Sequence, residues 1–143
     1  MSLLGRLRHL PPRLATGAFV LNAGLQKWSG DEQTAATTHG FASGAFPILK
    51  PIEPVKFLRL LAGAEIGLGA ALLLPIVPTV IAGTALTAFS SGLLGLYLRT
   101  PGLHKAGSIR PTQQGTPIAK DVWMLGIGLG LLADALAERA RRR

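Results

Sequence analysis

The stretch that decides the fold is residues 60–98, LLAGAEIGLGAALLLPIVPTVIAGTALTAFSSGLLGLYL. It holds one charged residue, Glu65, in 39 positions. A helix that faces water needs a polar face opposite its apolar stripe, and this stretch provides no charged face. Residues 60–98 therefore predict a membrane environment. The alternative, a buried helical bundle in a water-soluble protein, is disfavoured.

The same stretch predicts two helices joined by a tight turn. As one continuous helix, its 39 residues would extend about 58 Å, whereas the hydrocarbon core of a bilayer is roughly 30 Å thick. Pro75 and Pro78 fall in the middle, and proline breaks a helix because it lacks an N–H group and clashes with the preceding turn. We therefore expect a hairpin whose turn is LPIVPT, residues 74–79.

Two further apolar segments extend this pattern. A span takes about 20 helical residues, and residues 14–28 and 119–137 approach that length, with Lys and Arg side chains able to snorkel at their ends. Of the 143 residues, 15% are charged, against about 25% in an average soluble domain. We predict an all-α fold with one membrane domain, residues 1–143. It is an integral membrane four-helix bundle with spans at about 12–28, 55–74, 76–98 and 119–137.

Four spans put both termini on one side of the membrane. Basic residues beside spans favour the cytoplasmic side, and we place both termini there because of their compact arginines: Arg6, Arg8, Arg13, Arg139, Arg141, Arg142 and Arg143. On the outer side, residues 29–32 (SGDE) have a capping-box pattern, which predicts a short extramembrane helix in the first loop. Trp28, Tyr97 and Trp123 fall near the outer ends of spans and fit an interfacial aromatic belt.

Composition excludes several classes of function. The chain has no cysteine, which excludes disulfide scaffolds, thiol redox chemistry and cysteine-ligated metal centres. His9, His39 and His104 are scattered and lack the helical spacing of metal ligands, so we expect no metal site. The C-terminal arginines lie beside a predicted span, where they favour anionic lipid headgroups over nucleic acid.

Polar side chains inside predicted spans are costly in a bilayer and therefore mark candidate sites. Glu65 is the strongest of them, because it lies near the middle of its span. In an antiparallel bundle, other polar residues fall at a similar depth or at the outer mouth, and together they form a candidate polar pocket: Asn22, Lys27, Arg59, Glu65, Ser90 and Ser91. Such a pocket suits a polar headgroup such as that of a quinone, or a proton-accepting carboxylate. The alternative is that these side chains hydrogen-bond between helices and fix the bundle geometry.

Two other patterns have structural interpretations. Asp134 lies near the cytoplasmic end of the fourth span and close in sequence to Arg139 and Arg141, and we expect it to form a salt bridge or to serve as an interfacial anchor. Gly63 with Gly67, and Gly126 with Gly130, each form a small-xxx-small pattern, which lets two helix backbones approach closely. We expect all four glycines to face other helices.

The chain resembles a known family. Residues 17–27 (GAFVLNAGLQK) look like the opening helix of DoxX-type membrane proteins, and residues 63–74 (GAEIGLGAALLL) look like the second helix. Residues 100–128 (TPGLHKAGSIRPTQQGTPIAKDVWMLGIG) resemble the actinobacterial DoxX-like branch. The resemblance covers about residues 12–136. It implies a multi-pass, four-helix protein of the bacterial inner membrane, in a family of which some members are linked to quinone-dependent oxidation.

Two functional hypotheses follow. The first, implied by the resemblance, is a small quinone- or redox-associated subunit of an inner-membrane complex, with quinone as the candidate cofactor and no covalently bound group. The second is a noncatalytic scaffold or accessory subunit that packs against partner helices in the lipid bilayer, supplied by another membrane protein or by a second copy of the chain. A transporter is disfavoured, because four short spans with one central carboxylate make a small pathway. A cavity enclosed by the Glu65 region would favour the first hypothesis.

Overall fold

The structure, a computed structural model, describes residues 7–141. Every regular element in this range is helical, which confirms the all-α fold: α2 (Leu10–Trp28), α3 (Glu32–Ala45), the 3₁₀ turn η1 (Pro47–Leu49), α4 (Pro54–Leu73), α5 (Thr79–Arg99), α6 (Thr116–Ala119) and α7 (Val122–Ala140). The expected break after α4 is present, with Pro75 and Pro78 in the short connection to α5. Arg6, Arg142 and Arg143 lie outside the described residues.

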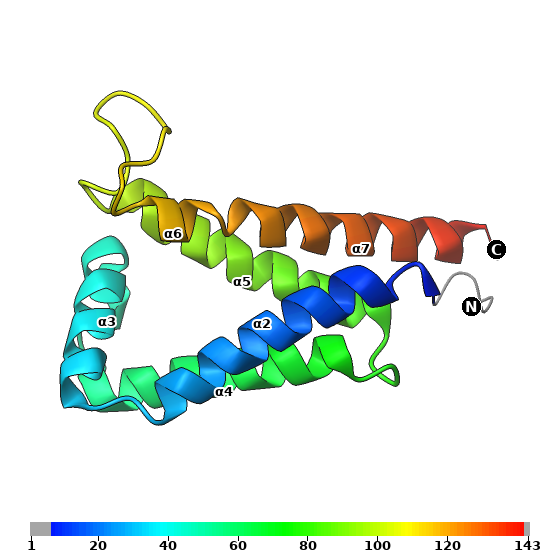
Figure 1. The fold of residues 1–143 in the computed structure, drawn as a ribbon, viewed down its shortest axis with the longest axis horizontal. Coiled ribbons are helices and arrows are strands. Elements are labelled where there is room, and N and C mark those ends of the chain that lie inside the picture. The colour runs from blue at the N-terminus through cyan, green and yellow to red at the C-terminus, as the bar shows by residue number, and fades with distance from the viewer. Residues whose placement is uncertain (1–6, 142–143) are drawn as a thin grey trace.

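The four long helices form two antiparallel pairs (Figure 1). α2 packs along α4, and α5 packs along α7, whereas contacts between α4 and α5 are few. The pairs meet at the end of the molecule that carries the connection between α4 and α5, and they diverge towards the other end, where α3 lies across the opening. One apolar cluster still joins all four helices: Val20, Leu68, Leu72, Ala82, Leu86, Met124 and Leu131.

Glycines set the close approach of α2 to α4. A Cβ atom added at Gly69 would lie 2.7 Å from the backbone nitrogen of Leu21, and one added at Gly24 would lie 2.8 Å from the backbone nitrogen of Ile66. Neither backbone can move away without separating the two helices. The α5–α7 contact is built in the same way, since a Cβ at Gly128 would lie 2.9 Å from the backbone nitrogen of Thr87.

The structure differs from the expectation for the other glycines. A Cβ added at Gly63, Gly67, Gly126 or Gly130 would meet no atom of the described chain within 4 Å. The physical reason is that a spacing of four identifies a smooth strip along a helix but does not fix which strip turns inward. On α4 the inward strip is the one that contains Glu65 and Gly69, both of which are buried.

The helix expected in the first loop is α3, and its N-cap is Asp31 rather than Ser29. The Oδ1 atom of Asp31 accepts hydrogen bonds from the Thr34 hydroxyl at 2.7 Å and from the Thr34 N–H at 2.8 Å, and these bonds lower the pKa of Asp31. Ser29 is instead the C-cap of α2, where its hydroxyl donates to the carbonyl oxygen of Gln26 at 3.2 Å.

The two kinds of glycine on α4 predict opposite effects of the same substitution. Gly69→Ala should lower the free energy of unfolding by about 1–3 kcal/mol, because the new methyl group overlaps backbone. Gly67→Ala should raise it by about 0.5–1 kcal/mol, because alanine favours the helix and meets open space. Thermal unfolding of the full chain in detergent measures both. Equal shifts of the two variants would contradict the packing of α2 on α4.

Candidate functional site

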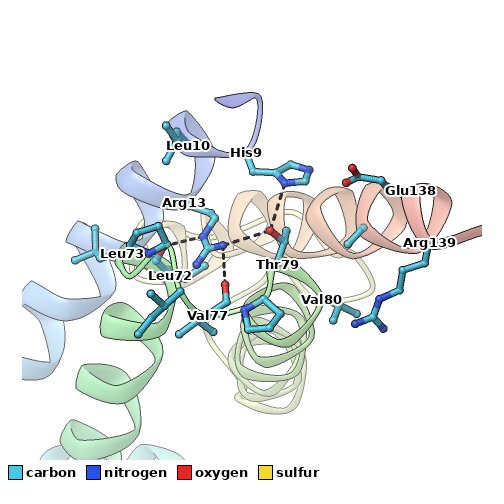
Figure 2. A pocket seen from close by; sticks show the side chains of 14 residues that line it. His9, Leu10, Arg13, Leu72, Leu73, Val77, Thr79, Val80, Glu138 and Arg139 are labelled. Carbon is cyan, nitrogen blue, oxygen red and sulfur yellow. Dashed lines mark hydrogen bonds between the residues drawn. The ribbon is translucent and has the colours of Figure 1, made fainter. Parts of the chain in front are cut away.

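A buried arginine lies where the first turn of α2 meets the end of α4 (Figure 2). Arg13 is 6% exposed. Its Nη1 donates to the Thr79 hydroxyl at 3.3 Å. The other N–H groups of its guanidinium donate to four backbone carbonyl oxygens, at distances of 2.8–3.1 Å: those of Ala71, Leu72, Leu74 and Val77. All five N–H donors of the guanidinium are therefore used.

The chemistry of the chain explains why an arginine occupies this place. The last carbonyl groups of a helix have no partner within the helix, and the connection after α4 contains Pro75 and Pro78, which have no N–H to offer. A cation also interacts favourably with the negative end of the helix dipole. Arg13 therefore caps α4 from a neighbouring helix. All five acceptors are neutral groups, so no carboxylate of residues 7–141 balances the charge of Arg13 by direct contact.

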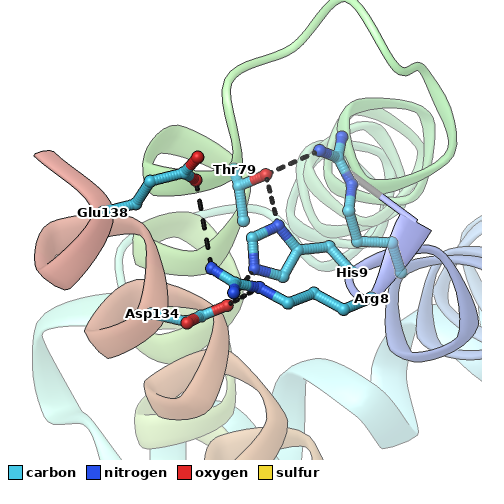
Figure 3. Close-up of polar contacts among 6 residues, drawn as sticks. Arg8, His9, Thr79, Asp134 and Glu138 are labelled. Carbon is cyan, nitrogen blue, oxygen red and sulfur yellow. Dashed lines mark hydrogen bonds and ion pairs between the residues drawn. The ribbon is translucent and has the colours of Figure 1, made fainter. Parts of the chain in front are cut away.

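A second set of polar contacts ties α2 to α5 and α7 (Figure 3). His9, the N-cap of α2, is 4% exposed. Its Nδ1 is 3.3 Å from the Thr79 hydroxyl oxygen, and its Nε2 is 2.5 Å from Oδ2 of Asp134. Arg8 places Nε 2.6 Å from the same Asp134 oxygen and Nη2 4.0 Å from Glu138. The salt bridge expected of Asp134 is thus formed with residues far away in the sequence, and among the described residues it does not involve Arg139 or Arg141.

A cavity of about 380 Å³ opens beside this cluster. Its lining includes five polar side chains: His9, Arg13, Thr79, Glu138 and Arg139 (Figure 2). Apolar side chains of the four long helices and of the proline connection complete the lining. We refer to it as the Arg13 cavity. Sequence reasoning missed this site, because Arg13 was grouped with the basic residues at the termini. One signal was available in the sequence, since Arg13 falls within the predicted span at 12–28. Its acceptors at the end of α4 are brought to it only by the fold.

An ion pair lies nearer the other end of α2. The Nζ atom of Lys27 donates to both carboxylate oxygens of Glu65, at 3.0 Å each. The Glu65 side chain is 6% exposed and that of Lys27 is 28% exposed. Asp121, which precedes α7, is close enough for its charge to interact with both of them. The close approach at Gly24, one turn before Lys27, brings the two helices near enough for this contact.

The six-residue polar pocket expected from the sequence is not assembled. Lys27 and Glu65 meet, but no hydrogen bond joins Glu65 to the other four residues, all of which the structure describes. Asn22 and Ser91 are exposed. The buried Ser90 hydroxyl donates to the carbonyl oxygen of Leu86 within its own helix, and the guanidinium of Arg59 lies 5.7 Å from the centre of a Trp28 ring. Similar depth does not bring side chains together, because the rotation of each helix about its axis also matters.

The aromatic residues divide between two roles. Trp28 and Trp123 are exposed, at 53% and 69%, as a belt would require. Tyr97 is 4% exposed, and its hydroxyl donates to the carbonyl oxygen of Ile109 at 2.8 Å. Tyr97 therefore holds the connection between α5 and α6 in place and does not face lipid. No group of three His, Asp or Glu side chains arranged to hold a metal ion was found in residues 7–141.

Neither protein-family models, nor curated proteins, nor solved structures show a match to the chain. The resemblance to the DoxX family therefore stays a prediction. Among the described helices, one is long and apolar enough to cross a membrane, judged by length and composition: α5. This is weak evidence of membrane association.

The capping role of Arg13 predicts that lysine cannot replace it. Arg13→Lys keeps the charge but supplies three donors where five are used, so at least two acceptors lose their partner. We expect a loss of about 2–4 kcal/mol in the free energy of unfolding, measured by thermal or denaturant unfolding. Arg110→Lys is the matched control, because Arg110 is exposed in the loop at the other end. An equally small effect at both positions would contradict the role of Arg13.

The ion pair predicts a strong coupling between Lys27 and Glu65. Lys27→Met leaves a buried carboxylate without its cation and should cost about 3 kcal/mol. Adding Glu65→Gln removes that carboxylate and should recover most of the loss. A double-mutant cycle on unfolding free energies measures the coupling. If the losses of the two single variants simply add in the double variant, the pair does not contribute as an interaction.

Proposed function

We propose that the protein is an integral membrane subunit of DoxX-like architecture, which crosses the bilayer with α2, α4, α5 and α7 and acts as a noncatalytic scaffold for partner helices. The helix lengths support this topology: 19 to 21 residues each extend about 30 Å, the thickness of the hydrocarbon core. The termini and the proline connection then lie on one side, with α3 and the loop at 100–115 on the other.

The distribution of apolar side chains also supports membrane residence. Each long helix exposes a large apolar residue within its length: Phe19 is 66% exposed, Leu60 58%, Ile81 56% and Leu129 49%. Conversely, Arg13 and Glu65 are buried within the protein. Water-soluble proteins seldom expose large contiguous apolar surfaces, whereas a lipid-facing surface must be apolar and must keep its charges inside the bundle.

The observation that carries the scaffold function is the pair of open glycine strips. Gly63 and Gly67 on α4, and Gly126 and Gly130 on α7, leave space where a side chain would stand. In a bilayer, helices associate through small residues that let backbones approach. The strips are not used within the described chain, so they remain available to a helix of another membrane protein or of a second copy.

The geometry gives less support to the quinone-associated hypothesis at Glu65. Both carboxylate oxygens of Glu65 already accept from Lys27. Glu65 does not line the Arg13 cavity. It also does not line a second, open groove, which runs along α3 and the end of α5. A headgroup site at Glu65 would require the ion pair to open, and this makes the scaffold function the simpler proposal.

The scaffold function predicts that assembly and folding respond to different glycines. Gly67→Leu and Gly126→Leu should reduce the cross-linked complexes formed in native membranes severalfold while leaving the unfolding temperature of the purified chain nearly unchanged, because the leucines meet open space. Gly69→Leu, the matched control, should lower the unfolding temperature itself. Unchanged complexes in both strip variants would contradict the scaffold function, and recovery of the chain in the soluble fraction would contradict membrane residence.

A further inference from the structure

We propose that the Arg13 cavity binds the phosphate group of an anionic amphiphile, with a phospholipid of the leaflet that contains both termini as its occupant. The inference rests on the membrane residence proposed above, but not on the scaffold function. Four features of the cavity support the proposal. They are its positive charge, the backbone N–H groups at the start of α5, the engagement of the nearby carboxylates by other residues, and the apolar side chains of the lining.

The charge of the cavity is positive. Arg13 brings a full positive charge that contacts only carbonyl and hydroxyl oxygens. Arg139 also lines the cavity, and its exposed side chain has no hydrogen bond or ion pair with any described residue. A bound phosphate would balance the buried charge of Arg13 and accept charge-assisted hydrogen bonds from Arg139, whose planar guanidinium suits phosphate oxygens.

The cavity also offers backbone donors. Thr79 and Val80, the first residues of α5, line it. The N-cap of α5 is Pro78, which makes no side-chain hydrogen bond to the first turn. The N–H groups at a helix N-terminus and the helix dipole both favour a negative group. Here they add to the two guanidinium groups, which give the site its charge.

The carboxylates near the cavity are already engaged. Asp134 is held by His9 and Arg8, and Glu138 lies 4.0 Å from Arg8. Of these two, only Glu138 lines the cavity, and its negative charge offsets one of the two positive charges of Arg13 and Arg139. Apart from His9, the ionisable side chains of the lining are Arg13, Arg139 and Glu138, which together carry an excess of one positive charge.

The apolar part of the lining identifies the class of ligand. Leu10, Leu73, Ile76 and Val80 line the same cavity as the cations, and Ile76 is 82% exposed at the proline connection. A small soluble anion gains no binding energy from these apolar side chains. A phospholipid places its phosphate group at the membrane surface and its acyl chains along apolar groups, so it can contact both parts of the lining. The volume of about 380 Å³ falls within the range of small-molecule sites.

The test is lipid retention by the full chain. The protein is reconstituted in nanodiscs of equal phosphatidylglycerol and phosphatidylcholine, and the retained lipids are measured by native mass spectrometry. We expect preferential retention of phosphatidylglycerol. Arg139→Gln should weaken its apparent affinity about tenfold, the effect of one charge-assisted hydrogen bond. Val80→Trp, which fills the cavity without changing charge, should also weaken it. Arg110→Gln, the same change in the loop at the opposite end, should leave retention unchanged.

A second arm distinguishes the source of the phosphate. Inorganic phosphate is added to the chain in lipid-free detergent, and the unfolding temperature is measured. Stabilisation that Arg139→Gln abolishes would support the anion site with soluble phosphate as its ligand. Equal retention of the two lipids by the wild type, or an equal loss in Arg110→Gln and Arg139→Gln, would overturn the lipid site. The phosphate arm needs no bilayer, so it tests the cavity even if the chain proves not to reside in membranes.

Discussion

The hydrogen bonds from Arg13 to the carbonyl end of α4 are the constraint on which the rest of the structure depends. The two prolines that force the chain to turn also deprive the end of α4 of donors, and in an apolar environment unpaired carbonyl groups are costly. Arg13 supplies these donors from α2 and contacts Thr79 at the start of α5. One side chain therefore fixes the ends of three helices. The Thr79 hydroxyl also contacts His9, and His9 contacts Asp134 on α7, so the fourth long helix is linked to the same end.

The pairing of α2 with α4 is specified at both ends by charge and between them by shape. Arg13 and Lys27 lie about 21 Å apart along α2, and both find their partners on or just after α4, in its final carbonyl groups and in Glu65. Between them, Gly24 and Gly69 permit backbone contact. A shift of α2 by one turn would separate both cations from their acceptors and place side chains where the glycines now stand, so the register has little freedom.

The glycines of the long helices lie on two kinds of surface, which the sequence alone does not distinguish. Gly24, Gly69 and Gly128 lie where helices of the chain touch, whereas Gly63, Gly67, Gly126 and Gly130 lie on faces that contact nothing described. Both sets have the composition of a helix–helix interface. Under the proposed scaffold function, the first set packs the helices of the chain against one another, and the second set contacts partner helices.

The sequence by itself determined the helical class, the positions of the four long helices and the break at the two prolines, because apolar patterning and proline geometry act locally. It also marked Glu65 as a buried carboxylate and Lys27 as a group within its reach. Only the tertiary structure decided how each helix is rotated about its axis. That rotation separated Asn22, Ser90 and Ser91 from Glu65, turned Gly69 inward and Gly67 outward, and paired Asp134 with His9 instead of its neighbours in the sequence. The Arg13 cavity needed the same information, because Arg13 and the carbonyl groups that it caps are 58 to 64 residues apart in the chain, and no local pattern connects them.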